Sequence, residues 1–162
     1  MIKMKEINMQ TKLDAFTEAF KSVVLSTVSK EGTPYASYTP FIKHESAYYL
    51  LMASQATHYQ NVISNQKVSL LFIEDESKAK SIFFRERLIY TATAEEVEIS
   101  PPLREKLSKE LGQMIDQLIQ MHFVLVKTTI IQGQFIIGPG AAYLVDEQQK
   151  IATQMTGGHK SK

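Results

Sequence analysis

The stretch SQATHYQN, residues 54–61, combines residue types and a position that could do chemistry. It follows a compact apolar run and opens a short helical pattern, so its backbone N–H groups and hydroxyls stand at a helix start, where anions bind well. Ser54, Thr57 and His58 could therefore hold a phosphate or a carboxylate. The same residues could instead do no more than cap a short helix, and local chemistry leaves both interpretations open.

The stretch FFRERLIY, residues 83–90, carries a second group that could bind an anion. Arg85 and Arg87 alternate along a predicted strand, so both side chains point to the same face. Paired guanidinium groups suit phosphate or carboxylate recognition, because each can donate two parallel hydrogen bonds. A solvated strand face is the alternative interpretation of this pattern.

The chain ends in TGGHKSK, which places His159 directly after two glycines. A glycine hinge would allow one imidazole to reach a metal, and neutral imidazole is a common metal ligand. A histidine near a terminus can also be incidental. The other histidines, His44, His58 and His122, lie far apart and show no zinc-binding spacing.

Composition and missing motifs exclude several other classes of function. The 162 residues contain no cysteine, which excludes disulfides and thiolate nucleophiles and fits a reducing cytoplasm. The formal net charge of +1 offers no basic field for nucleic acid. No apolar run approaches the roughly 18 residues of a membrane span, and the polar start MIKMKEINMQTK does not have the pattern of a signal peptide. We therefore expect neither nucleic acid nor a membrane as a partner.

The elements that must position these residues are predicted to be mostly strands. Apolar residues at spacings of three and four predict helices over residues 8–20 and 103–121, and a short helix is expected within 54–66. Strands are predicted over residues 23–29, 35–43, 47–54, 67–75, 82–99, 122–130 and 132–146. Six or more short strands linked mostly by hairpins predict a mainly β (α+β) fold, a closed antiparallel barrel with peripheral helices.

The length of the chain predicts one domain over residues 1–162. Within it, the N-terminal helix lies inside residues 1–20. Residues 147–162 are polar and continue no pattern, so they are expected to form a flexible C-terminal tail.

Several motifs taken together resemble one family. They are the run VLSTVSKEGTPYASYTPFI, the segment SQATHYQN, VSLLFIEDE, RxRLxY and FIIGPGAAY. These motifs are similar to those of the HugZ/HutZ haem-utilisation proteins, within the pyridoxamine 5′-phosphate oxidase-like, FMN-binding split-barrel superfamily. The resemblance covers about residues 23–143. It implies a six-stranded antiparallel split β-barrel that forms a homodimer with two equivalent sites at the subunit interface.

The resemblance also implies roles for individual residues. In flavin-binding relatives, the segment matching Ser54 to Asn61 lies near the FMN phosphate. In the haem proteins, a C-terminal Gly–His element supplies the axial iron ligand, and His159 matches it. Arg87 is the best candidate to meet the haem propionates.

One position departs from the family pattern. Haem-degrading relatives can carry an acidic residue at the start of the strand matching residues 122–130, placed to hydrogen-bond the axial histidine across the dimer. Here His122 stands in or near that place. It can donate a hydrogen bond to the axial histidine or accept one from it, and so tune the iron–imidazole bond. It cannot supply the same negative charge.

These expectations describe a haem-binding and haem-degrading protein of iron acquisition in the cytoplasm. Haem would lie between protomers, an unidentified electron donor would supply the reductant, and Ser54, Thr57, His58 and Arg87 would converge on one cleft near the dimer interface. No catalytic side chain is singled out, because the hard chemistry belongs to the cofactor. Two alternatives use the same cleft: an FMN-dependent oxidoreductase, and a haem carrier without turnover.

Overall fold

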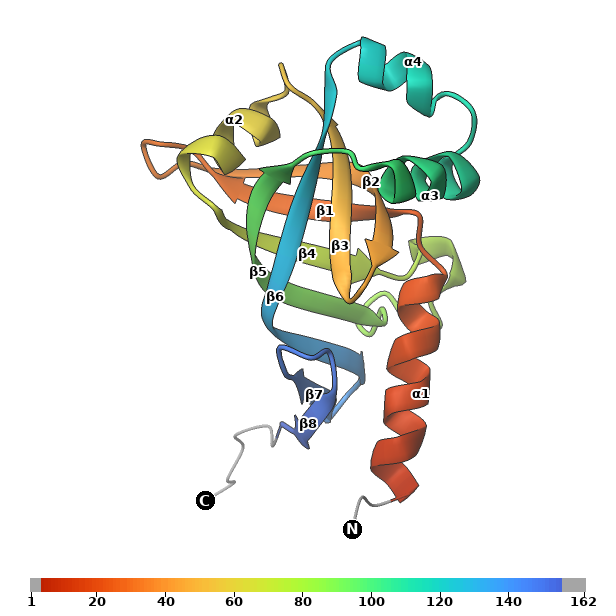
Figure 1. Cartoon of the computed structure of the whole chain (residues 1–162). Coiled ribbons are helices and arrows are strands. Elements are labelled where there is room, and N and C mark those ends of the chain that lie inside the picture. The colour runs from red at the N-terminus through yellow and green to blue at the C-terminus, as the bar shows by residue number, and fades with distance from the viewer. Residues whose placement is uncertain (1–3, 156–162) are drawn as a thin grey trace.

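The computed structural model describes residues 4–155, with side chains from residue 8 onward. Six antiparallel strands follow the order β3-β2-β1-β4-β5-β6, and pairing between β6 and β3 closes the ring (Figure 1). They are β1 (Ser22–Val28), β2 (Pro34–His44), β3 (Ala47–Ala53), β4 (Lys67–Ile73), β5 (Arg87–Val97) and β6 (Phe123–Gly138). The predicted fold class, a mainly β, six-stranded antiparallel barrel with peripheral helices, is confirmed.

Alternating side chains fill the barrel interior. In β4 the buried residues are Val68, Leu70 and Phe72, and in β5 they include Leu88 and Tyr90. Each large apolar side chain that is buried in this way contributes about 1.5–3 kcal/mol to folding. A slip of one residue would turn the whole set outward, so the burial also fixes the strand register.

The N-terminal helix α1 (Met4–Glu18) packs against the barrel core. Leu13 is buried, the Phe16 ring lies 5.4 Å from that of Phe135, and the Phe20 ring lies 5.7 Å from that of Phe72. The apolar residues at spacings of three and four therefore predicted this helix correctly. The helix begins four residues earlier and ends two residues earlier than predicted.

Two helices occupy the region in which the sequence predicts one. α3 (Pro101–Leu111) ends at Gly112, whose φ of 98° requires a residue without a side chain, and α4 (Ile115–Gln120) follows. The prediction of a continuous helix over 103–121 is wrong because the apolar spacing continues across this break. Both helices pack with outward-facing residues of β2, β3 and β6 in a second core, which consists of Ile42, Ala47, Tyr49, Leu51, Leu103, Leu107, Ile115 and Leu125.

A hairpin of β7 (Ala141–Val145) and β8 (Ile151–Gln154) extends the sheet beyond β6. The expectation of a flexible tail from residue 147 is therefore wrong for β8, a strand without an apolar pattern that the sequence could reveal. α1 holds this hairpin: the Gln10 side-chain N–H donates to the Gln149 carbonyl at 3.2 Å, and its side-chain oxygen accepts from the Ile151 N–H at 2.8 Å.

Among residues 4–155, no helix has both the length and the apolar character that a bilayer crossing requires.

Candidate functional site

The first turn of α2 (Thr57–Ser64) is open to an anion. The N-cap residue is Ala56, which has no side-chain oxygen, so neither Ser54 nor Thr57 is the N-cap residue. The N–H groups of Tyr59 and Gln60 reach back to the Ala56 carbonyl at 3.1 and 3.2 Å. The N–H groups that precede them point out of the helix start, where an anionic oxygen is stabilised by hydrogen bonds and the helix dipole.

His58 lies in this first turn and is held by a serine from β2. Its Nδ1 lies 2.8 Å from the Ser37 hydroxyl, which itself donates to the Leu25 carbonyl at 3.4 Å. The contact fixes the orientation of the ring, and the tautomer of His58 decides which of the two atoms donates. Burial lowers the pKa of His58, so the ring is neutral at pH 7.

Asn61 anchors α2 to the barrel wall. Its side chain is buried and donates to the Thr27 hydroxyl at 3.0 Å, next to the buried Val62. This bond uses an Asn61 side-chain N–H within the barrel, so Asn61 positions the helix. The role predicted for it near a cofactor stays a prediction.

His122 lies beside the α2 segment, as the Ser54 N–H donates to the His122 carbonyl at 3.0 Å. His122 is exposed and has a φ of 65°, which turns the chain from α4 into β6. The structure therefore brings Ser54, Thr57, His58 and His122 to one end of the barrel.

The two arginines lie elsewhere. Residues 82–86 are not part of β5, so the prediction that Arg85 and Arg87 alternate on one strand is wrong. The Arg85 guanidinium donates twice to the Glu74 carbonyl, at 2.7 and 3.0 Å, and the Arg87 guanidinium donates to the Arg85 carbonyl at 3.1 Å. Arg85 therefore closes the loop between β4 and β5, which includes the short 3₁₀ helix η1 (Glu76–Lys78).

β5 separates Arg87 from α2 within one chain. The Tyr59 hydroxyl donates to Glu96 at 2.7 Å, which holds α2 near the far end of β5. Glu96 is nine residues after Arg87, a span of about 30 Å at strand spacing. Within one chain, Arg87 therefore lies apart from Ser54, Thr57 and His58, so the cleft expected near the dimer interface needs a second copy to supply Arg87.

A row of side chains that are apolar except for one glutamine, which the sequence analysis missed, crosses the outer face of the sheet. Paired positions on six strands place Tyr38, Val24, Leu71, Ile89, Gln134 and Leu144 side by side. Tyr38 is 70% exposed and Leu144 is 37% exposed, while Val24, Leu71 and Ile89 are half-buried. The signal was available in the strands themselves, since outward positions in a solvated strand are usually polar.

Iron ligation by His159 falls outside the residues that the structure describes. Within residues 4–155, no three or more His, Asp or Glu side chains gather in a way that could hold a metal ion.

The closed antiparallel barrel of six strands, with α2 at one end, is the architecture of the split-barrel class. The chain belongs to the pyridoxamine 5′-phosphate oxidase family, whose sequence model matches residues 9–135, and to the HugZ/HutZ haem-utilisation proteins within that superfamily. The resemblance drawn from sequence motifs is thus confirmed.

The relatives include proteins whose names mention haem. The chain is 34% identical over 142 residues to the protein named heme oxygenase HutZ of Vibrio cholerae. The aligned region covers 85% of this chain and 81% of HutZ. A crystal structure of Campylobacter jejuni ChuZ matches with a TM-score of 0.85 at 28% identity, over 96% of this chain and 67% of ChuZ. A crystal structure of V. cholerae HutZ, described there as a heme storage protein, matches with a TM-score of 0.68 at 29% identity, over 83% and 92% of the two chains.

Proposed function

We propose that this protein binds haem and degrades it, as part of iron acquisition in the cytoplasm. The observation that carries the proposal is the open first turn of α2 with its neutral His58, in a chain whose relatives HutZ and ChuZ it matches over most of its length. Haem carries two propionates, and a helix start with free N–H groups suits a carboxylate. The absence of cysteine fits a reducing compartment.

Two copies of the chain make the site. The row from Tyr38 to Leu144, which is apolar except for Gln134, offers a face for a second copy. Exposed apolar patches commonly mark interfaces. Because Arg87 lies about 30 Å along β5 from α2, we infer that Arg87 comes to each site from the second copy, where its guanidinium meets a propionate.

Each residue then has a defined task toward the haem substrate. The α2 start and Arg87 hold the propionates, and His159 supplies the axial imidazole from the C-terminal segment. His58 offers Nε2 of its neutral ring for a hydrogen bond, in an orientation that Ser37 fixes. His122, beside Ser54, is the candidate partner of the axial imidazole. Haem iron, when bound, supplies the redox chemistry, with electrons from a donor that remains to be identified.

Two alternatives have specific support. An FMN-dependent oxidoreductase is favoured by the match to the pyridoxamine 5′-phosphate oxidase family and by the α2 start, which suits a phosphate equally well. A haem carrier without turnover is favoured by the description of V. cholerae HutZ as a heme storage protein.

Titration of the purified protein with haem and, separately, with FMN separates these functions. The proposal expects a saturable Soret band with haem, loss of that band when ascorbate and oxygen are added, and no stoichiometric FMN binding. A stable Soret band under ascorbate and oxygen would identify a carrier, and FMN binding in place of haem would identify a flavoprotein.

The Arg87→Gln variant tests the second-copy site. It should weaken haem binding by about 1.5–3 kcal/mol, the range for a hydrogen bond to a charged group. Arg104→Gln is the matched control, because Arg104 pairs with Asp116 on the surface at 2.7 Å. Equal haem affinity of both variants would exclude Arg87 from the site.

A further inference from the structure

The β7–β8 hairpin sets the point from which the C-terminal segment starts. The Met155 N–H donates to the Ala142 carbonyl at 2.7 Å, which fixes the chain at the end of the described residues. Ala142 pairs with Ile136 of β6, and Ile136 pairs with Arg87 of β5. The segment that follows Met155 therefore starts in line with Arg87, about three strand spacings or about 14 Å away from it.

The place of Met155 limits where His159 can act. His159 comes four residues after Met155, and four residues of extended chain span at most about 14 Å. A shift of the hairpin therefore moves the region that the imidazole can reach. A group on a short tether binds as if it were at high local concentration, and this advantage is lost when the tether cannot span the distance to the site.

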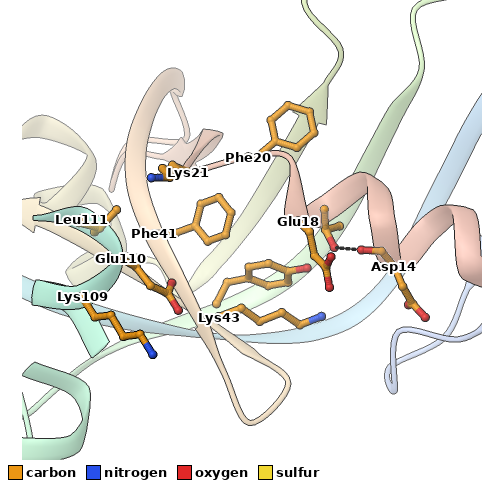
Figure 2. A pocket seen from close by; sticks show the side chains of 11 residues that line it. Asp14, Glu18, Phe20, Lys21, Phe41, Lys43, Lys109, Glu110 and Leu111 are labelled. Carbon is orange, nitrogen blue, oxygen red and sulfur yellow. Dashed lines mark hydrogen bonds between the residues drawn. The ribbon is translucent and has the colours of Figure 1, made fainter. Parts of the chain in front are cut away.

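Apolar packing contributes little to the position of β8. Ile151 is half-buried, whereas residues 152–154 are exposed. The neighbouring helix α1 is not packed against α3, because a cavity of about 690 Å³, lined on the α1 side by Asp14 and Glu18, lies between the two helices (Figure 2). Polar bonds from α1 and from the turn between β7 and β8 are therefore important for the position of the hairpin.

Two glutamines supply these bonds. Gln10 of α1 donates from Nε2 to the Gln149 carbonyl at 3.2 Å and accepts at Oε1 from the Ile151 N–H at 2.8 Å. Asp14 accepts a further bond from Nε2 of Gln10 at 2.9 Å, which orients the amide. Gln149 is buried and donates from its own Nε2 to the Ser46 carbonyl, in the turn between β2 and β3. The bonds from the two glutamines to the hairpin and to Ser46 join segments more than a hundred residues apart, so they fix the hairpin relative to the barrel.

We propose that Gln10 and Gln149 are positioning residues for haem binding. They hold the hairpin so that the segment after Met155 starts at the Arg87 end of the sheet and brings the His159 imidazole to the iron. This inference rests on the proposed function, because it needs His159 as the axial ligand. The glutamines act through His159, so their effect on haem binding should disappear when the imidazole is absent.

A double-mutant cycle, followed by haem affinity and the Soret band, tests this role. Gln10→Met and Gln149→Met keep the length of the side chain and remove its hydrogen bonds. Each should weaken haem binding about twofold to tenfold, the factor that corresponds to one hydrogen bond. In the His159→Ala background, neither change should weaken haem binding further. Gln148→Met is the matched control and should bind haem like the unmodified protein, because the Gln148 side chain is exposed and donates to Glu147 in the same turn.

Amide hydrogen exchange in the protein without haem shows whether a variant releases the hairpin or unfolds as a whole. In Gln10→Met the Ile151 amide should exchange faster, while the amides of β4 should stay as protected as in the unmodified protein. Faster exchange throughout the barrel would overturn a local role for Gln10.

The haem affinities separate the failure of this inference from the failure of the proposed function. The positioning role is overturned, with haem ligation by His159 left in place, if Gln10→Met and Gln149→Met bind haem as tightly as Gln148→Met. It is also overturned if their effect persists in the His159→Ala background. Equal haem affinity of the unmodified protein and His159→Ala would instead remove the axial ligand of the proposed function and, with it, this role.

Discussion

The Ser37 hydroxyl lies 2.8 Å from Nδ1 of His58 and joins the first turn of α2 to the wall of the barrel. The two residues are 21 positions apart in the chain and meet because β2 runs beneath the helix start. The contact fixes the orientation of the ring, so that Nε2 of a neutral His58 is the ring nitrogen left for the proposed haem site.

The free energy of unfolding should decrease as the pH is lowered, because of His58. Burial lowers the pKa of His58 in the folded state below its unfolded value of about 6.5. The unfolded chain therefore binds the proton first, so this contribution is fully present above about pH 6.5 and is lost as the pH falls toward the folded pKa. The free energy of unfolding, measured by urea denaturation between about pH 8 and about pH 5, should fall more steeply for the unmodified protein than for His58→Gln. Parallel pH profiles would contradict this prediction.

Gly133 has no side chain, and this leaves room for the Tyr90 ring. A Cβ at Gly133 would lie 2.5 Å from the Tyr90 ring and 2.9 Å from the Ile89 carbonyl. Gly133→Ala should therefore destabilise the protein by about 1–3 kcal/mol, the usual cost of overpacking. Gly138→Ala is the control on the same strand, because nothing lies within 4 Å of a Cβ there. Equal denaturation midpoints for the two variants would show that Tyr90 can move aside.

Tyr48→Phe should not destabilise the protein. Its hydroxyl is buried without a hydrogen bond, and removing such a group should raise the free energy of unfolding by about 1 kcal/mol. Thr128→Val is the contrasting variant, because the buried Thr128 hydroxyl donates to the Tyr48 carbonyl at 2.8 Å and its loss should cost about 1 kcal/mol. Denaturant titration of both variants measures the difference. A clear loss of stability in Tyr48→Phe would mean that the hydroxyl is paired.

The outer apolar row should hold the dimer together. Ile89→Glu places a charge in the middle of the row and should convert a dimer of twice 18.4 kDa into the 18.4 kDa monomer, because an unpaired charge is costly to bury. Thr93→Glu, at an exposed position farther along β5, should remain dimeric. Sedimentation velocity at micromolar concentration distinguishes the two masses. A monomeric unmodified protein, or a dimeric Ile89→Glu variant, would remove the row from the interface.

The barrel could be predicted from the sequence because most of its strands have a local sequence pattern that is typical of strands. In β4, Val68, Leu70 and Phe72 alternate with less buried residues, and the turns between strands carry glycine, proline or charged residues. The break at Gly112 could not be predicted in this way, since the apolar spacing of α3 continues into α4. β8 also left no signal, as its place depends on the bonds from Gln10, which lies more than a hundred residues earlier in the chain.

The candidate site was predictable only in part. The start of α2 follows from local chemistry, so the sequence could predict that Ser54, Thr57 and His58 lie together. The sequence could not predict that Arg87 lies far from these three residues. A pattern of alternating residues shows which face of a strand a side chain is on, but not at which end of the barrel the strand begins. Ser37 was missed since a serine in a strand carries no sign of the histidine that it will meet.

A haem titration of the unmodified protein and of His159→Ala, followed by the Soret band, tests the central claim most directly. Lys160→Ala serves as the control for a change in the same segment. The unmodified protein and the control should bind haem with one spectrum, whereas His159→Ala should shift the Soret band and bind haem more weakly, with an unchanged unfolding midpoint in the absence of haem. Identical haem spectra and affinities for all three proteins would contradict axial ligation by His159 and would move the flavin alternative ahead.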